Sequence, residues 1–347
     1  MRRFGASALG LLAGLAPAAA AVDGGWTARV VEGVSPVAEV RPLGDGRAFI
    51  RTATGWRRIV ATATGPCLAE ARPPARLPMP KGGLPDGEVV SAPDLGVARA
   101  WLSRPTRRYD HGILGDAIEA GGFVVVDTAG KRHELVLPKG YVFEDLYPRI
   151  FDLEGDGRPD FAIIVSSLKK GASVIVYSLT KDGLKGIKRT PHIGRPHRWL
   201  NPVGIADFDG DGIKDVALVA TPHIGGTVRI WSLGRRNPRL LPGETGGFSN
   251  HWIGSRILLA SGIADIDGDG RPELFVPSGT RKDLRILRYD DGLRQFAWIA
   301  LPGRVSSALA FLAVPGRPPL VFHADDRGRL VAVAFGKAPR TLPPCAG

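Results

Sequence analysis

The chain has 347 residues, of which 44% are apolar, with 46 glycines, 29 prolines and two cysteines. This composition supplies enough apolar material for one large folded domain and excludes disordered and collagen-like classes. The formal net charge of +12 leaves two alternatives, attraction to an anionic glycan or lipopolysaccharide and a solvated basic surface. We expect no nucleic-acid partner, because Lys and Arg form no stripe with interleaved aromatic residues.

Residues 1–21 have the pattern of a secretory signal peptide: two arginines, a short apolar segment and an alanine-rich end. The alternative is a transmembrane anchor, but this apolar segment is short for crossing a bilayer. We therefore expect cleavage near Ala21 and a mature domain of residues 22–347 without a transmembrane anchor. That domain is expected to be a periplasmic or secreted monomer.

Two eroded structural units are predicted in the first part of the mature chain. One surrounds residues 44–46, and the other begins near Asp94 but lacks the carboxylates found at the corresponding positions of later units. We expect no metal in the second unit. An insertion at residues 107–119 interrupts it between its second and third predicted strands. The insertion carries candidate ligand-binding residues, namely Asp110, His111, Asp116 and Glu119.

Three acidic nonapeptides then recur at a nearly constant spacing, at residues 152–160, 207–215 and 265–273. We call them the first, second and third acidic loops. Side-chain oxygens at positions 1, 3, 5 and 9, with a backbone carbonyl from position 7, suit a Ca²⁺ ion, which takes six to eight oxygen ligands. The predicted ligands are Asp152, Glu154, Asp156, Arg158 and Asp160; Asp207, Asp209, Asp211, Ile213 and Asp215; and Asp265, Asp267, Asp269, Arg271 and Glu273.

An EF-hand would require a bidentate Glu at position 12 and flanking helices. Position 12 is apolar here, and it lies in a short run rich in β-branched and aromatic residues, which predicts a buried strand. The same order of strand, acidic loop, strand, turn and strand recurs around each copy. The pattern predicts an all-β fold, a β-propeller of four-stranded blades, with six blades and seven as the alternative.

The two ends of the chain are expected to close the ring. Residues 307–312, 319–322 and 330–335 give three strands of a last unit, and residues 26–31 can supply the fourth. The two cysteines, Cys67 and Cys345, are expected to form a disulfide, since an even pair in an exported protein is more often bridged than free.

The acidic loops and the apolar strand after each resemble the FG-GAP/VCBS repeats also found in integrin α subunits. The best copy is residues 206–222, and the strongest matching covers residues 139–302. This resemblance implies a propeller with calcium in the loops. The Phe-Gly half of the FG-GAP signature is missing, which makes VCBS-type repeats the closer match. Family membership does not fix a biological role, because such folds carry many functions.

A second group of polar residues is predicted on the opposite face of the propeller. Because strands alternate in direction, loops between strands two and three, and those between blades, emerge away from the acidic loops. Histidines recur in these loops within the motifs Pro-His-Ile-Gly and His-Trp-Ile-Gly. For each histidine alone, a structural hydrogen bond between blades is the alternative to a binding role. Besides the insertion residues, the candidates are His192, His197, Asn201, His223, Asn250 and His251.

These observations favour an exported calcium-binding propeller that acts as a binding or scaffold module for a protein or glycan. The alternative is an extracytoplasmic hydrolase or lyase acting on an anionic polymer, using Asp110, His111, Asp116 and Glu119. No catalytic residue is assigned, because Gly-x-Ser-x-Gly, His-Glu-x-x-His and P-loop motifs are absent from the sequence.

Overall fold

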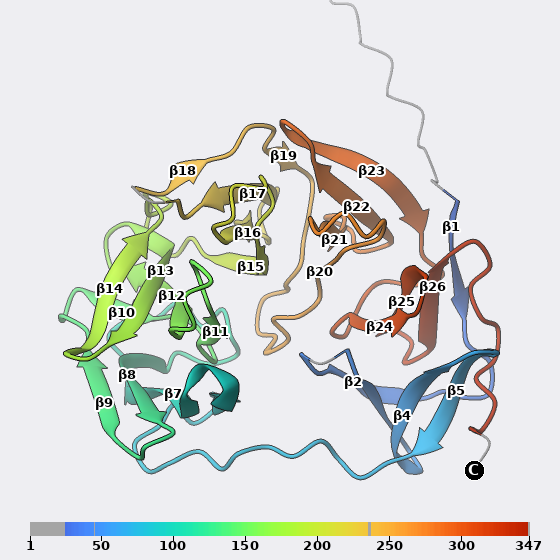
Figure 1. Cartoon of the computed structure of the whole chain (residues 1–347), viewed down its shortest axis with the longest axis horizontal. Coiled ribbons are helices and arrows are strands. Elements are labelled where there is room, and N and C mark those ends of the chain that lie inside the picture. The colour runs from blue at the N-terminus through green and yellow to red at the C-terminus, as the bar shows by residue number, and fades with distance from the viewer. Residues whose placement is uncertain (1–24, 45, 235–236, 346–347) are drawn as a thin grey trace, which may run out of the picture.

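The computed structural model describes residues 25–44, 46–234 and 237–345. The predicted signal peptide and Asp45 of the first eroded unit lie outside these residues. The described chain forms antiparallel sheets arranged around a common centre, with the chain running round the ring from its N-terminal to its C-terminal part (Figure 1). This confirms the predicted all-β propeller, and the number of blades stays a prediction. None of the described helices is long and apolar enough to cross a bilayer.

Each acidic loop joins the first and second strands of a sheet, as predicted. The loops connect β11 (Arg149–Phe151) to β12 (Asp160–Ser167), β15 (Leu200–Ala206) to β16 (Asp215–Ala220), and β20 (Gly262–Ala264) to β21 (Glu273–Pro277). The second strands are buried throughout, which is why they read as continuous apolar runs. The sheets continue through β13 (Gly171–Thr180) and β14 (Gly183–Arg189); β17 (Thr227–Ser232), β18 (Arg239–Leu240) and β19 (Thr245–Gly246); and β22 (Asp283–Tyr289) and β23 (Leu293–Ala300).

Two further strand groups precede these repeats. The first is a four-stranded sheet of β2 (Val37–Pro42), β3 (Ala48–Thr52), β4 (Gly55–Thr62) and β5 (Gly65–Glu70). The second contains β6 (Val90–Ala92), the 3₁₀ helix η1 (Pro93–Leu95), β7 (Val97–Thr106), β8 (Glu119–Asp127) and β9 (Arg132–Val136). It is joined to β12 through β10 (Tyr141–Phe143), which gives one nine-stranded sheet. The insertion lies between β7 and β8, as expected.

The ring closes by mixing the two ends of the chain in one sheet. Strand β1 (Trp26–Val30) pairs antiparallel with β26 (Leu330–Phe335), which continues to β25 (Arg317–Ala324) and β24 (Ala310–Val314). The structure also contains the predicted Cys67–Cys345 disulfide, with the two Cα atoms 5.0 Å apart. The tail beside it is held by a hydrogen bond from Leu68 N to Pro343 O of 2.8 Å. Both predictions about closure are therefore confirmed.

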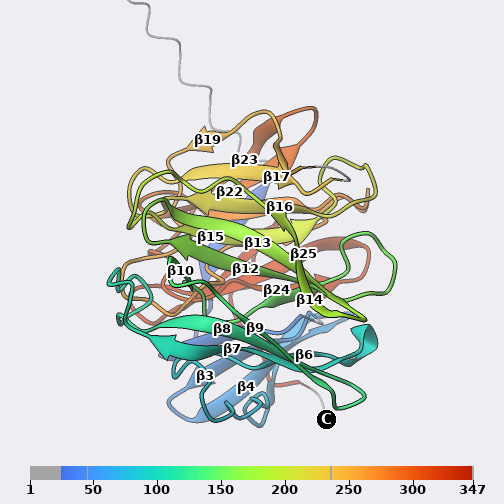
Figure 2. The same cartoon turned by 90° about the vertical axis from the view of Figure 1, so that its left-hand side faces the viewer.

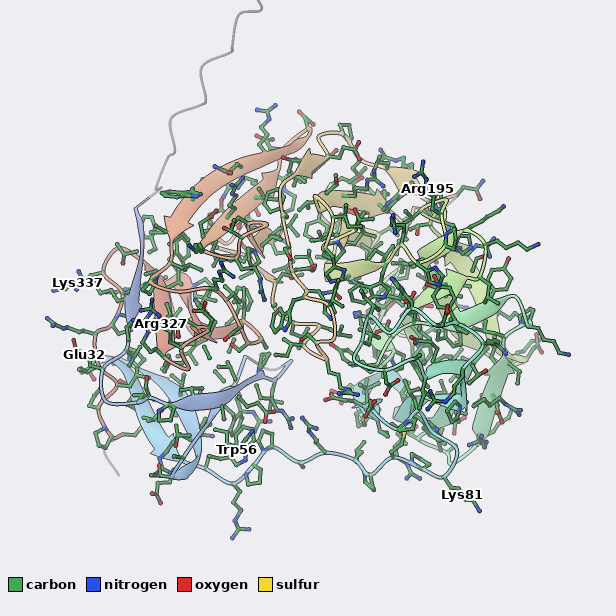
Figure 3. All side chains as sticks on the ribbon, turned by 180° about the vertical axis from the view of Figure 1, so that it is seen from behind. Glu32, Trp56, Lys81, Arg195, Arg327 and Lys337 are labelled. Carbon is green, nitrogen blue, oxygen red and sulfur yellow. A yellow bond between two sulfur atoms is a disulfide. The ribbon has the colours of Figure 1, made fainter. Side chains whose placement is uncertain are left out.

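The hydrophobic core lies between neighbouring sheets. One buried cluster joins Ile164 and Val174 to Val216 and Leu218 of the next sheet, so the sheets pack face to face. Figure 2 shows them stacked, with loops projecting at both sides. Basic side chains are spread around the periphery, where Lys81, Arg195 and Lys337 lie at separate places (Figure 3).

The second strands set the distance between the two sets of loops. In β12 the acidic loop ends at Asp160, whereas Ser167 lies at the other end of the eight-residue strand. At about 3.3 Å per residue, the two ends are roughly 25 Å apart. The acidic loops and the histidine-bearing loops therefore form two separate candidate sites.

Candidate functional site

The carboxylate at position 1 organises each acidic loop. In the second loop, Asp207 Oδ1 accepts a hydrogen bond from Gly210 N and Asp207 Oδ2 accepts one from Gly212 N, each 2.8 Å long. Both glycines have positive φ, at 78° and 85°, which L side chains rarely adopt and which explains glycine at positions 4 and 6. The same bonds recur from Gly155 and Gly157 to Asp152, and from Gly268 and Gly270 to Asp265.

The carboxylate at position 9 is buried where the second strand begins. Asp215 is fully buried, and its Oδ2 accepts a hydrogen bond of 2.9 Å from Phe208 N. Its other oxygen, Oδ1, has no hydrogen-bond partner of good geometry, although the Ser232 side chain is near enough to favour the ionised form. Desolvation raises the pKa of Asp215 to about 7. A buried carboxylate oxygen without a partner is costly unless a cation or donor reaches it.

The second loop fits a Ca²⁺ ion best. Ligand oxygens of Asp207, Asp209 and Asp211 lie within 4.8 Å of one another. Asp215 is not part of this group, and its role as a fourth ligand stays a prediction. Oxygen ligands of this kind suit Ca²⁺ rather than a soft transition metal. The backbone carbonyl predicted as a ligand at Ile213 stays a prediction.

The other two loops are less open to a metal. In the first loop, Asp156 accepts hydrogen bonds from Arg158, including one of 3.0 Å from its backbone N. Within the described chain, Asp152, Glu154 and Asp156 do not bring their oxygens as close together as the second loop does.

In the third loop, the oxygens of Asp265, Asp267 and Asp269 do lie close together. However, Arg271 pairs with Asp269, and Arg288 pairs with both Asp267 and Glu273. The predicted carbonyl ligands at Arg158 and Arg271 stay predictions.

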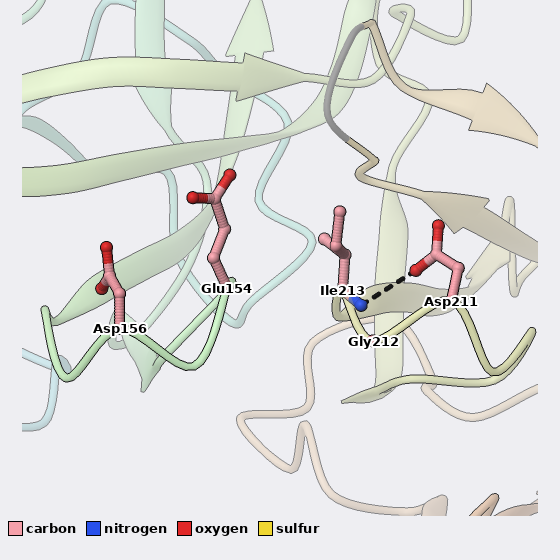
Figure 4. Close-up of a pocket in the computed structure, with 5 residues that line it drawn as sticks. All are labelled: Glu154, Asp156, Asp211, Gly212 and Ile213. Carbon is pink, nitrogen blue, oxygen red and sulfur yellow. Dashed lines mark hydrogen bonds between the residues drawn. The ribbon is translucent and has the colours of Figure 1, made fainter.

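A small pocket separates the first and second loops (Figure 4). Its volume is about 230 Å³. Acidic side chains from both loops line it. The lining residues are Glu154, Asp156, Asp211, Gly212 and Ile213.

At the opposite end of the strands, two histidines form a hydrogen-bonded chain. His251 Nε2 is 2.9 Å from the carbonyl oxygen of Ser255, and His251 Nδ1 is 2.9 Å from His223 Nε2. A carbonyl only accepts, so His251 donates through Nε2 and accepts through Nδ1 from His223. This leaves a lone pair on Nδ1 of His223. Burial lowers the pKa of His223 to about 4 and that of His251 to about 3, so both imidazoles are neutral at pH 7.

A histidine–glutamate pair lies in the same region. His111 Nδ1 hydrogen bonds to Glu144 Oε1, and the Ser166 hydroxyl donates to the other oxygen of Glu144. Glu144 is fully buried, and this desolvation raises its pKa although its partners oppose the shift. The indole of Trp199 donates to the Glu144 carbonyl, and its ring is 4.6 Å from that of His251. Trp199 therefore connects the pair to the histidine chain.

The insertion contributes a third part of this region. His197 donates its backbone N–H to the Tyr109 hydroxyl over 2.8 Å, and the two rings are stacked with centroids 5.1 Å apart. His197 Nε2 lies 2.9 Å from Asp110 Oδ1, and its ring is 5.3 Å from that of His111. Together these residues form what we call the histidine cluster: Tyr109, Asp110, His111, Glu144, Ser166, His197, Trp199, His223 and His251.

Glu119 lies near this cluster but is buried. Its side chain is 1% exposed, and Oε1 has no hydrogen-bond partner. Desolvation, with added repulsion from Glu144 and other carboxylates, raises the pKa of Glu119 to about 9. The carboxyl is therefore protonated at pH 7.

The remaining predicted ligand residues have other partners. His192 Nδ1 bonds the carbonyl of Gly171 over 2.8 Å. Tyr141 is the one aromatic ring paired with it among the described residues, and within that part of the chain no hydrogen bond or ring pair joins His192 to the cluster. Asp116 pairs with Arg256 at 3.3 Å and accepts from Ile118 N.

Asn201 and Asn250 use their amide nitrogens to connect neighbouring parts of the chain. Each Nδ2 donates to the other residue's backbone carbonyl over 3.3 Å, and Asn201 also donates to Leu258 O. Both asparagines are fully buried, and neither Oδ1 has a hydrogen-bond partner among the described residues. The predicted binding role of these two residues stays a prediction.

Sequence reasoning missed three residues of this region. Glu144 follows the apolar residues of β10 directly, and an acidic residue next to a buried strand was the available signal. Ser166 lies inside an apolar strand, where nothing in the sequence marks it. Arg281 stacks over Trp252 at 4.4 Å and lowers the pKa values of His223 and His251 through its charge.

Comparison with known proteins gives one family match. Residues 152–218 match the model of the FG-GAP-like repeat family, and this stretch contains the first and second acidic loops. No curated protein sequence matches the chain.

Comparison with solved structures gives matches of low sequence identity and TM-scores below 0.5. Rhamnogalacturonan lyase YesW is 16% identical with a TM-score of 0.44, over 85% of this chain and 59% of that one. An auxiliary nutrient binding protein from Bacteroides thetaiotaomicron VPI-5482 is 9% identical with a TM-score of 0.41, over 88% and 70%. BBS1N, in its complex with ARL6DN soaked with lead, is 13% identical with a TM-score of 0.41, over 92% and 98%. The match of residues 152–218 to the FG-GAP-like repeat model confirms the predicted resemblance for this stretch, which lies within an all-β fold of antiparallel sheets.

Proposed function

We propose that this protein is an exported, calcium-stabilised β-propeller that binds a protein or glycan partner through the histidine cluster. The observation that carries the calcium part is the second acidic loop. Three carboxylates gather there beside Asp215, whose buried Oδ1 has no partner. A Ca²⁺ ion would supply the charge and the coordination that this oxygen lacks. Calcium sites of moderate affinity fill at the calcium concentrations found outside the cytoplasm. Export, which the signal-peptide pattern of residues 1–21 predicts, would place the protein there.

The calcium part is tested by titration calorimetry on the mature, chelator-treated protein. We expect calcium uptake and a higher melting temperature, since a ligand that binds only the folded state stabilises it. Asp207→Asn should reduce the number of bound ions by one, because Asp207 holds the second loop and supplies a ligand. A correctly folded wild-type protein that takes up no calcium would refute this part of the proposal.

The binding part rests on the surface around the histidine cluster. Ile224 directly follows His223, and Ile253 lies two residues after His251. Their side chains are 62% and 70% exposed. Exposed apolar side chains beside polar groups are typical of ligand-binding surfaces. The lone pair on His223 Nδ1 would accept a hydrogen bond from a hydroxyl or amide of the partner.

This part is tested by screening the calcium-loaded protein against a glycan panel and purified cell-envelope polymers. Ile224→Asn should weaken binding without changing the melting temperature, because its side chain is exposed. Ile187→Asn is the matched control, since Ile187 is 41% exposed on β14. Equal effects of the two substitutions would contradict a binding face at the histidine cluster.

A second candidate function, a hydrolase or lyase acting on an anionic polymer, is favoured by the His111–Glu144 pair. A buried carboxylate bonded to Nδ1 orients an imidazole and leaves its Nε2 able to exchange a proton with a substrate. Depolymerisation of a polyuronate by the wild-type protein, lost in Glu144→Gln with binding retained, would support this function. Unchanged depolymerisation in that variant would exclude a role for the pair.

A further inference from the structure

One position on the third strand distinguishes the third acidic loop from the other two. Asp160 pairs in register with Ser178, and Asp215 pairs with Ser232. In the third repeat Leu274 pairs with Leu287, so Glu273 lies opposite Arg288. Position 9 thus faces a small neutral serine in two repeats and a guanidinium in the third.

Arg288 contacts two of the four carboxylates predicted as calcium ligands in its loop. Its Nε lies 2.6 Å from Glu273 Oε1, and its Nη2 lies 2.6 Å from Asp267 Oδ2. The guanidinium also packs over the Phe296 ring, 4.5 Å from the centroid. The Glu273 side chain is 1% exposed, so water does not solvate its carboxylate. The guanidinium of Arg288 compensates the negative charge instead. Charge-assisted bonds of this kind are short and directional.

Among the residues that the structure describes, the second loop has no equivalent of Arg288. Asp215 Oδ1 has no partner of good geometry, and the residue opposite is neutral Ser232. Arg239 does pair with Asp209 at 2.9 Å, and the two side chains are 62% and 9% exposed. The guanidinium makes this one bond to the loop from a largely solvated position, where charge pairing is weakened by water and salt. We therefore expect a divalent cation to displace Arg239 more readily than Arg288. Displacing Arg288 would break two bonds, one of them to a buried carboxylate.

We propose that Arg288 is a built-in cation of the third acidic loop, which therefore folds without calcium, whereas the second loop requires the metal. The inference rests on the proposed calcium binding by the repeats. The guanidinium is bonded to carboxylate oxygens at positions 3 and 9. Its positive charge would repel a metal ion bound to the remaining carboxylates at positions 1 and 5. The third loop has Glu at position 9 where the other two loops have Asp, and it has Arg on the neighbouring strand where they have Ser. The two differences occur together. The two changes together convert a metal loop into an arginine-held loop.

The test exchanges these two residues between loops. Glu273→Asp with Arg288→Ser should add one bound calcium ion per protein in calorimetry, and adding Asp265→Asn should remove that gain. The reverse pair, Asp215→Glu with Ser232→Arg, should remove one ion while the melting temperature without calcium is maintained or rises. In the otherwise wild-type protein, Asp265→Asn should leave the number of bound ions unchanged.

The outcomes separate this inference from the proposed function. A folded wild-type protein without calcium uptake would refute the proposed function, and the Glu273→Asp/Arg288→Ser protein would still decide the role of Arg288. Loss of one ion on Asp265→Asn alone would overturn the inference, as would a folded Glu273→Asp/Arg288→Ser protein that gains none. Circular dichroism and the melting temperature in chelator establish that each variant is folded.

Discussion

Replacement of Glu119 by Gln should change how the stability of this protein depends on pH. Glu119 is 1% exposed and sits among other carboxylates, so the pKa of its carboxyl is raised from 4.5 to about 9. The unfolded chain loses this proton near pH 4.5, whereas the folded protein retains it until about pH 9. Folding therefore takes up a proton between these values, and the free energy of unfolding falls as pH rises through this window.

The size of the effect follows from the pKa difference. Each pH unit within the window costs about 1.4 kcal/mol, so at pH 7 the stabilisation present at low pH is reduced by about 3 kcal/mol. Gln has nearly the same shape and does not titrate. Its additional N–H groups in a buried place lower stability by an amount that is independent of pH. The pH slope therefore isolates the ionisation from that constant cost.

The assay is urea unfolding of wild type and Glu119→Gln from pH 5 to pH 8, in chelator to exclude metal linkage. The difference in unfolding free energy should shift by about 4 kcal/mol in favour of the Gln variant over this range. Glu70→Gln is the control for the chemical exchange, because the Glu70 side chain is 90% exposed. Parallel profiles for wild type and Glu119→Gln would contradict this prediction, since they would mean that Glu119 ionises equally in the folded and unfolded states.

Three further predictions concern the disulfide, the histidine chain and the N-terminus. The Cys67–Cys345 bond spans a sequence separation of 278, so its removal in Cys67→Ala/Cys345→Ala should cost on the order of 5 kcal/mol in urea unfolding. Alkylation of both thiols without prior reduction would disprove the bond. His251→Ala should lower stability by about 1–3 kcal/mol because the Ser255 carbonyl loses its donor; an unchanged urea midpoint would argue against this bond. In a host with a secretion pathway, N-terminal sequencing should find a chain starting after Ala21, whereas a retained Met1 would contradict export.

Much of the fold could be predicted from local sequence. The acidic loops, the apolar strand after each and the recurrent third strand are encoded by neighbouring residues, because strand burial depends on a short periodic pattern. Closure by residues 26–31 was predictable because the last unit lacks a strand. The Cys67–Cys345 pair was predictable because only two cysteines exist. By contrast, the merging of two strand groups through β10 had no local signal, since it depends on pairing between segments that are not adjacent in sequence.

The sites divide in the same way. The type and spacing of the predicted acidic ligands are visible along the chain, and so is the recurrence of histidines in loops away from them. Which of these residues contact one another depends on the folded arrangement of the sheets. His223 and His251 are hydrogen bonded, His192 lies apart, and Glu144 joins His111 from another strand group. Likewise Arg288 reaches the third loop only because sheet register places it opposite Glu273. Burial and charge pairing at a site arise from residues distant in sequence, and spacing along the chain does not encode them.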